Sequence, residues 1–433
     1  MLRSLYQKLL DWKDSLRRKP LILQGARQVG KTYLIKEFGT KEYADVAYFN
    51  FEEKPKLVSL FENELSPAAL IQSLQIELQK KIEPQKTLMI WDEVQVSPNA
   101  LNSLKYFYEN NPEYHLICAG SLLGITLGQQ KSFPVGKVNF LNLYPLSFVE
   151  FLQALGFSEL LSLLKEKKDF SPLPELFHQK LIAQLKLYYF LGGMPEVVKN
   201  YLQNQDLLEA RTIQQEILRS YLLDFSKHAQ SVDVIKIQQV WGQVPSQLAK
   251  ENKKFSVSEL HKNARLREYR VPIQWLLEAG LLQKVGRVSL PKIPLNGYLQ
   301  EGFSKLYLLD TGLLGALLEL TPKTLIEGNE LFTHFHGAQV ENFVAQELLT
   351  YCEKPIYYWS SQGRAEVDFL VSLEEEIIPI EVKAGENTRS RSLGEYVRNY
   401  HPEKALRFSL RNYHFHNGAS DIPLYDVFRI LSL

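Results

Sequence analysis

Cysteine is scarce in this chain, and its placement argues against both disulfide bonds and zinc. The 433 residues include two cysteines, Cys118 and Cys352, which lie far apart in apolar stretches. Neither belongs to a cluster of cysteine and histidine with the spacing of zinc ligands. Small proteins that depend on disulfides carry many more cysteines, so the composition predicts a protein of a reducing compartment.

Long apolar runs and an excess of either charge are also absent. No run approaches the roughly 20 apolar residues of a membrane-spanning helix. The first twenty residues mix leucine with lysine, arginine and aspartate, unlike a signal peptide. We therefore expect a cytoplasmic protein without a membrane segment. The formal net charge is +1, so any surface that binds nucleic acid would have to be locally basic.

The most informative sequence that is present is Gly25-Ala26-Arg27-Gln28-Val29-Gly30-Lys31-Thr32, which matches the phosphate-binding pattern G-x-x-x-x-G-K-[ST]. The apolar run at 20–23 predicts a buried strand before this loop, and residues 33–38 predict a helix after it. The backbone N–H groups of such a loop surround a polyphosphate, and the helix dipole adds positive charge. We predict that residues 25–32 and Tyr33 bind ATP. Lys31 would contact the β and γ phosphates, and Thr32 would bind Mg²⁺.

A second buried strand ends in two carboxylates. Residues 87–91 are apolar after Thr87 and lead directly into Asp92 and Glu93. We predict that Asp92 holds Mg²⁺ through water and that Glu93 orients and deprotonates the attacking water, which favours ATP hydrolysis over binding alone. A third apolar run ends at Ser121, which either senses the γ phosphate or serves only as a turn residue or helix cap.

Short apolar runs alternate with helical patterns over residues 1–150. This alternation predicts a parallel sheet covered by helices on both faces, with the nucleotide at the carboxyl ends of the strands. The predicted strands span residues 20–23, 46–51, 87–91, 115–119 and 138–143. Residues 151–228 are predicted to form a helical lid.

Residues 229–325 show the pattern of a winged helix: a helix opening at 255–260, a second helix from Glu268 to Ala279, and strands near 281–285 and 305–309. Basic residues gather around the second helix, namely Lys253, Lys254, Lys262, Arg265, Arg267 and Arg270. Two interpretations remain open. The second helix contacts DNA, or the domain packs on the nucleotide-binding domain and its basic face is only solvated.

A further set of charged residues lies within residues 326–433. Glu341 falls on a predicted helix, Asp368 on a predicted strand, and Glu381 and Lys383 two apart on the next strand, so that they share a face. If these strands pair, the carboxylates converge in a candidate second Mg²⁺ site, beside a lysine that could activate water. Pro379 in the same strand indicates an edge position or a bulge.

This order resembles the PD-(D/E)XK restriction-endonuclease-like fold, and the whole chain resembles a family of prokaryotic AAA-superfamily P-loop ATPases with a C-terminal domain of unknown function. The stretches that carry the second resemblance are 25–32, 91–95, 119–121, 144–151, 192–196, 309–313, 337–342, 364–369 and 381–383. The resemblance implies an α/β protein in which an AAA-type parallel sheet precedes a helical lid, a winged helix and a nuclease-like α/β domain. It also implies ATP and Mg²⁺ as cofactors, and a homo-oligomer if catalysis needs an arginine from a neighbouring subunit.

Two hypotheses of function follow. The first is an ATPase that gates a module directed at nucleic acid, with DNA as the candidate partner and Lys383 as a candidate nuclease residue. The second is a nucleotide-dependent switch for protein interaction, in which the nuclease-like domain has lost catalysis. The near-neutral charge favours the second hypothesis.

Overall fold

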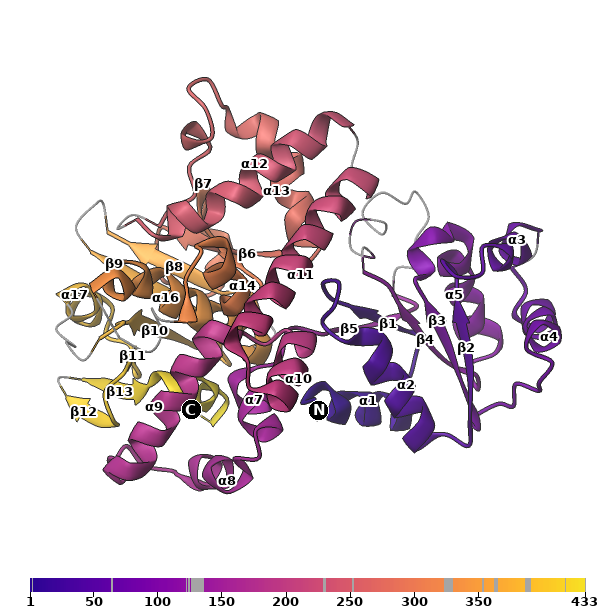
Figure 1. Ribbon diagram of the computed structural model, residues 1–433, viewed down its shortest axis with the longest axis horizontal. Coiled ribbons are helices and arrows are strands. Elements are labelled where there is room, and N and C mark those ends of the chain that lie inside the picture. Colours follow the sequence, from indigo (N-terminus) through magenta and orange to yellow (C-terminus); the bar gives the residue numbers. More distant parts are fainter. Residues whose placement is uncertain are drawn as a thin grey trace. The chain divides into compact units, whose positions relative to one another are not determined.

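The computed structural model describes the chain apart from residues 2, 64, 122, 124, 126–135, 229–230, 251–252, 323–329, 353, 362–364, 386–390, 417 and 433. Two units emerge: an N-terminal unit of residues 2–144 with 278–280, and a C-terminal unit of residues 1, 145–277 and 281–433 (Figure 1). The boundaries of the predicted winged-helix domain, after residue 228 and after residue 325, stay predictions. Among the described residues, no helix is long and apolar enough to cross a membrane.

The N-terminal unit contains a five-stranded, wholly parallel sheet in the order β2-β3-β4-β1-β5. The five predicted strands are confirmed within two residues at each end. The strands are β1 (Leu21–Gln24), β2 (Asp45–Asn50), β3 (Thr87–Asp92), β4 (His115–Ala119) and β5 (Asn139–Asn142). The helices are α1 (Leu5–Asp14), α2 (Lys31–Glu42), α3 (Lys56–Asn63), α4 (Pro67–Leu78) and α5 (Pro98–Asn110), with a 3-10 turn η1 (Val94–Val96).

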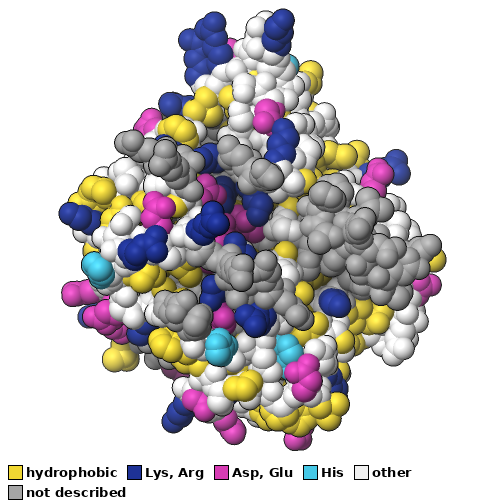
Figure 2. All heavy atoms as spheres, turned by 90° about the vertical axis from the view of Figure 1, so that its left-hand side faces the viewer, with side chains coloured by type: hydrophobic (Ala, Val, Ile, Leu, Met, Phe, Trp, Pro, Cys, Tyr) yellow, Lys and Arg dark blue, Asp and Glu magenta, His cyan; other side chains and the backbone are white. Residues whose placement is uncertain are grey.

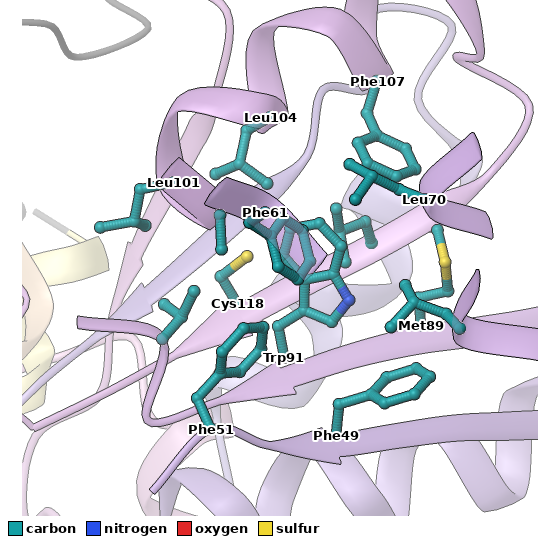
Figure 3. Packing of buried hydrophobic residues seen from close by; sticks show 14 of the residues in the cluster. Phe49, Phe51, Phe61, Leu70, Met89, Trp91, Leu101, Leu104, Phe107 and Cys118 are labelled. Atoms are coloured by element: carbon teal, nitrogen blue, oxygen red, sulfur yellow. The ribbon is translucent and has the colours of Figure 1, made fainter. Parts of the chain in front are cut away.

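Strands β3 and β4 are buried along their whole length, because helices cover both faces of the sheet. Helices α3, α4 and α5 pack on one face, and α1 and α2 lie on the other (Figure 1). Trp91 is at the centre of the first packing layer, with its ring 5.2–6.1 Å from those of Phe51, Phe61 and Phe107 (Figure 3). This layer fixes the end of β3, and therefore the position of Asp92.

The C-terminal unit joins helices to an eight-stranded mixed sheet in the order β12-β13-β11-β10-β9-β8-β6-β7. The strands are β6 (Leu282–Val288), β7 (Leu299–Leu308), β8 (Tyr357–Ser360), β9 (Glu366–Leu373), β10 (Glu376–Val382), β11 (Leu406–Ser409), β12 (His414–His416) and β13 (Ala419–Pro423). The helices are α7 (Phe148–Ala154), α8 (Ser158–Glu166), α9 (Glu175–Leu191), α10 (Pro195–Asn204), α11 (Leu207–His228), α12 (Ser231–Leu248), α13 (Leu266–Glu278), α14 (Thr311–Leu317), α16 (Glu330–Cys352) and α17 (Arg391–Tyr400). Short 3-10 helices are η2 (Val257–Glu259), η3 (Leu295–Tyr298) and η4 (Leu424–Ser432).

Two predictions for this unit need correction. The helix expected at 255–260 is only the three-residue η2, and the Ser256 side chain does not cap it. Pro379 lies in β10, which pairs with β9 and β11 and is therefore an internal strand. Proline is tolerated there because pairing with β11 begins one residue later, at Ile380. The predicted strands at 281–285 and 305–309 do form an antiparallel pair, but β6 also pairs with β8 and so extends the C-terminal sheet.

Candidate nucleotide site and a second charged centre

The loop between β1 and α2 has the backbone of a phosphate cradle. Gly25, Gln28 and Gly30 have positive φ angles of 145°, 68° and 94°. A Cβ atom on Gly25 would lie 2.2 Å from the carbonyl oxygen of Leu143, so only glycine fits this position. Successive turns of this kind direct backbone N–H groups into one concave surface at the start of α2, where the helix dipole is positive.

Lys31 folds back over this loop. Its Nζ donates hydrogen bonds to the carbonyl oxygens of Gly25 and Ala26, at 2.8 and 2.7 Å. Burial lowers the pKa of Lys31 to about 8, although the charges of Glu93 and Asp92 oppose that effect. The ammonium group therefore lies within the loop, where it is poorly solvated and held by neutral acceptors.

Thr32 and Asp92 meet across two elements that are distant in the sequence. Thr32 Oγ1 donates to Asp92 Oδ2 at 2.7 Å, and the Tyr48 hydroxyl donates to the same oxygen at 2.9 Å. Asp92 is 2% exposed. A hydroxyl and a carboxylate oxygen side by side suit Mg²⁺, which prefers hard oxygen ligands and retains several waters. The residues present therefore fit a Mg²⁺ ion that is shared with bound ATP.

Sequence reasoning missed Tyr48. It lies near the end of β2, two residues before the position that pairs with Asp92. The Nζ of Lys36 is 3.5 Å from the centre of the Tyr48 ring. A polar side chain near the carboxyl end of a predicted strand was the available signal, but the sequence did not show that β2 neighbours β3.

Glu93 and Ser121 follow neighbouring strands. Glu93 has a φ angle of 51°, and its Oε2 accepts a 2.6 Å hydrogen bond from Gln95 Nε2. The Gln95 amide lies against Gly120, because a Cβ atom added to Gly120 would be 2.0 Å from Gln95 Oε1. Because β3 and β4 are parallel neighbours, the segments that carry Glu93 and Ser121 leave the same edge of the sheet. The roles predicted for these two residues stay predictions.

The four predicted residues of the second centre also come together. In the antiparallel pair of β9 and β10, Phe369 lies opposite Ile380, and Asp368 and Glu381 are the next residues on the two strands. Asp368 Oδ2 accepts a 2.8 Å hydrogen bond from the backbone N–H of Val382. Lys383 Nζ is 2.6 Å from Glu381 Oε1, as expected for residues on one strand face.

Two lysines that sequence reasoning did not assign to this centre lie among its carboxylates. Lys305, on β7, is 0% exposed, and its Nζ is 2.9 Å from Glu341, 2.8 Å from Glu366 and 3.6 Å from Asp368. Lys253 forms a second ion pair with Glu341, whose Oε1 also accepts a hydrogen bond from the Tyr307 hydroxyl. The signal for Lys305 was a lysine directly before the apolar run at 306–309.

These ion pairs determine the protonation of the centre. Burial lowers the pKa of Lys305, but the charge of Glu341 and its neighbours outweighs burial and holds the value well above the ordinary one. Burial raises the pKa of Glu341, yet Lys253 and Lys305 reverse that effect and lower it to about 2. Burial, followed by the charges of Glu341 and Glu381, raises the pKa of Asp368 to about 7.

The centre as folded does not fit a metal ion. Within the described part of the chain, no group of three histidine, cysteine, aspartate or glutamate side chains is arranged to hold one. The ammonium group of Lys305 lies where Glu341, Glu366 and Asp368 converge. We therefore derive no chemistry through a second Mg²⁺ at this centre.

The basic residues of the predicted winged helix divide into two groups. Lys253 pairs with Glu341, and Lys254 lies 3.9 Å from Glu366, so both face the second centre. The others are exposed: Lys262, Arg265, Arg267 and Arg270. Arg270 is 3.7 Å from Glu301, which is itself almost fully exposed, so this ion pair contributes little. Arg364, quoted for the family resemblance, lies outside the described residues.

Comparison with known families divides the chain into three matched segments. Residues 17–152 match the model of an AAA domain, and this match identifies an AAA-type P-loop ATPase domain in the N-terminal unit. Residues 182–324 and 336–433 match two different domains of unknown function, DUF8612 and DUF4143.

The relatives themselves are of unknown function. Uncharacterized proteins of Mycobacterium bovis and Mycobacterium tuberculosis are 35% identical over 88 residues, which is 20% of this chain and only 19% of each relative's length. An uncharacterized protein of Methanocaldococcus jannaschii is 23% identical over 399 residues, which cover 89% of this chain and 78% of that protein.

Two solved structures are similar at a distance. A Walker-type ATPase of Pyrococcus abyssi has a TM-score of 0.45 and 15% identity, over 73% of this chain and 95% of that chain. The Aeropyrum pernix Orc1 protein, solved in complex with DNA, has a TM-score of 0.30 and 13% identity, over 74% and 93% of the two chains. Likeness at this level carries no argument about function.

Proposed function

We propose that the N-terminal unit binds ATP with Mg²⁺ and hydrolyses it. The observation that carries this proposal is the 2.7 Å hydrogen bond between Thr32 and Asp92, which joins the residue after the loop lysine to a strand end 60 positions away. Both side chains would then hold Mg²⁺ beside the β and γ phosphates. Bound Mg²⁺ would neutralise the charge on the transferring phosphoryl group.

The other residues of the site have separate tasks in this proposal. Lys31 exchanges its carbonyl partners in the loop for β and γ phosphate oxygens, which solvate an ammonium group better. Glu93 orients a water in line with the γ phosphate and accepts its proton. Ser121, beyond the neighbouring strand, would contact the γ phosphate.

Turnover by two lysine variants tests the proposal. Lys31→Ala should lose ATP hydrolysis by about 100-fold or more, because the phosphate contact is lost. Lys41→Ala is the matched control: it lies on the same helix, pairs with Glu37 and is half exposed, so it should retain wild-type turnover. Equal turnover by wild type and Lys31→Ala would refute hydrolysis at this loop.

We infer further that residues 326–433 adopt a nuclease-like fold of the PD-(D/E)XK kind. Support comes from the topology after α16: strands β8, β9 and β10 form an antiparallel meander, and α17 then leads to β11, which is parallel to β10. The candidate residues Asp368, Glu381 and Lys383 lie on or directly after the two central strands of this arrangement.

Between an ATP-gated nuclease and an interaction switch, the charged centre favours the switch. The carboxylates that a nuclease would offer to Mg²⁺ are ion-paired with Lys305 and Lys253. Acidic and basic side chains are also interspersed over the face in Figure 2, whereas a dedicated nucleic-acid surface is continuously basic. In this proposal ATP binding and hydrolysis change the affinity of the chain for a partner.

A cleavage assay separates the two candidates. The protein would be incubated with single-stranded, duplex and branched DNA and RNA, with Mg²⁺ or Mn²⁺, and with or without ATP. The switch predicts no cleavage under any of these conditions. Cleavage that disappears in Lys383→Ala would establish the nuclease instead, and its dependence on ATP would show whether the two centres are coupled.

A further inference from the structure

Among the described lysines and arginines of the C-terminal unit, Lys305 is the most completely buried. Its side chain is 0% exposed, and its three closest acidic partners come from two elements, Glu341 from α16 and Glu366 and Asp368 from β9. A buried ammonium group is tolerated only when acceptors replace its lost water. The three carboxylates supply that replacement, so Lys305 and the acidic residues depend on one another.

The arrangement reproduces what a divalent cation would do at this centre. A metal would cancel the charge of converging carboxylates and fix their oxygens around one point. The ammonium group of Lys305 has three N–H donors and lies 2.8–3.6 Å from three carboxylates, so it performs both tasks. Lys253 adds a second positive charge on Glu341. A metal ion in the same place would face two ammonium groups, and repulsion at such distances is strong in a buried site.

Glu381 has one carboxylate oxygen that the ion pairs of the centre leave without a partner. It is 4% exposed, and its Oε2 is buried without a hydrogen-bond partner, while Oε1 pairs with Lys383. An unpaired buried carboxylate oxygen is unusual in folded proteins. With Lys305 removed, this oxygen would join Glu341 and Asp368 as hard oxygen ligands of the type that divalent cations select.

We propose that Lys305 is a resident cation that takes the place of a divalent metal, so that the C-terminal centre is complete without a metal ion and excludes one. The inference deepens the proposed function, because it rests on the nuclease-like fold of residues 326–433. It makes the domain an interaction module whose charged centre is fixed by the chain itself rather than by metal supply.

Counting bound Mn²⁺ in nucleotide-free protein by electron paramagnetic resonance tests this proposal. Lys305→Met keeps the length of the side chain and removes its charge. This variant should bind one more Mn²⁺ per chain than wild type, and Mn²⁺ should raise its unfolding temperature by about 4 °C or more while leaving wild type unchanged. Lys284→Met, a surface lysine on β6, is the matched control and should behave as wild type.

Two results would overturn the proposal. One is a folded Lys305→Met protein that gains no Mn²⁺. The other result comes from proteins that retain Lys305. If Glu381→Gln binds fewer Mn²⁺ ions than wild type, the centre binds metal in the presence of Lys305. Unchanged Mn²⁺ binding in Glu381→Gln supports the proposal even if Lys305→Met does not fold. ATP turnover measured in the same preparations tests the proposed ATPase separately. An absence of turnover would not change the conclusion drawn from the Mn²⁺ counts.

Discussion

In the proposed function, Glu93 is the residue that distinguishes ATP hydrolysis from ATP binding alone. Its φ angle of 51° turns the chain sharply after β3, and the hydrogen bond from Gln95 fixes one of its carboxylate oxygens. Asp92, one residue earlier, already has Thr32 and Tyr48 as partners. In the proposed function the two adjacent carboxylates therefore have different tasks: Asp92 would hold the metal and Glu93 would orient water.

Glu93→Gln should separate binding from hydrolysis. The amide cannot accept a proton, so we expect turnover to fall by about 10²–10⁴-fold while ATP affinity stays near that of wild type. Steady-state ATPase rates and binding of a fluorescent ATP analogue measure the two quantities. Glu37→Gln, on α2 and paired with Lys41, serves as control. Parallel loss of affinity and turnover in Glu93→Gln would contradict the assignment of a catalytic base.

At the scale of elements, two glycine motifs of the C-terminal unit form one buried junction. Gly192 ends α9 with a φ angle of 69°, and the backbone N–H of Gly193 donates to Asp310 Oδ2 at 2.6 Å. Asp310 also caps α14 through the N–H of Leu313. A Cβ on Gly193 would lie 2.0 Å from the carbonyl oxygen of Leu146, so the two backbone segments are in direct contact. The junction joins α9, α14 and the segment before α7.

Gly193→Ala should therefore destabilise the C-terminal unit by about 2–4 kcal/mol, because the added methyl group meets backbone that cannot move aside. Gly242→Ala is the opposite case. Gly242 lies inside α12 with nothing within 4 Å of an added Cβ, so alanine should stabilise by about 0.5–1 kcal/mol. Urea unfolding of both variants measures the difference. If the two substitutions had the same effect, close packing at the junction would not be the cause.

Local sequence patterns predicted which segments form strands and helices better than they predicted which of these segments pair with one another. The phosphate-binding loop and the strand leading to Asp92 were readable because each is continuous in sequence. The three-residue η2 was overestimated because a serine such as Ser256 begins turns as well as helices. Pairing of β6 with β8 joins residues 286–288 to residues 357–359, and no periodicity within either strand carries that information. Tyr48 and Lys305 were missed for the same reason, since their partners lie on elements that are distant in the sequence.

At the scale of the whole molecule, the C-terminal unit contains carboxyl groups whose pKa is raised by burial. Glu347 on α16 accepts a hydrogen bond from the backbone N–H of Phe148 at 3.0 Å. Burial raises its pKa from 4.5 to about 8, with a smaller contribution from the charge of Glu150. Burial likewise raises the pKa of Asp310 to about 6. These groups link helices α7, α9, α14 and α16, so their ionisation affects the assembly of the unit.

The stability of the C-terminal unit should fall as the pH rises from about 4.5 to 8. In that range the unfolded chain releases the proton of Glu347 and the folded chain keeps it, so ionisation favours the unfolded state by a few kcal/mol, at most about 5. Glu347→Gln keeps the acceptor for Phe148 but cannot ionise, so urea unfolding between pH 5 and 8 should show a flatter pH dependence than in wild type. Glu196→Gln, an exposed glutamate of α10, should retain the wild-type slope. Identical slopes for wild type and Glu347→Gln would mean that Glu347 is already ionised in the folded protein.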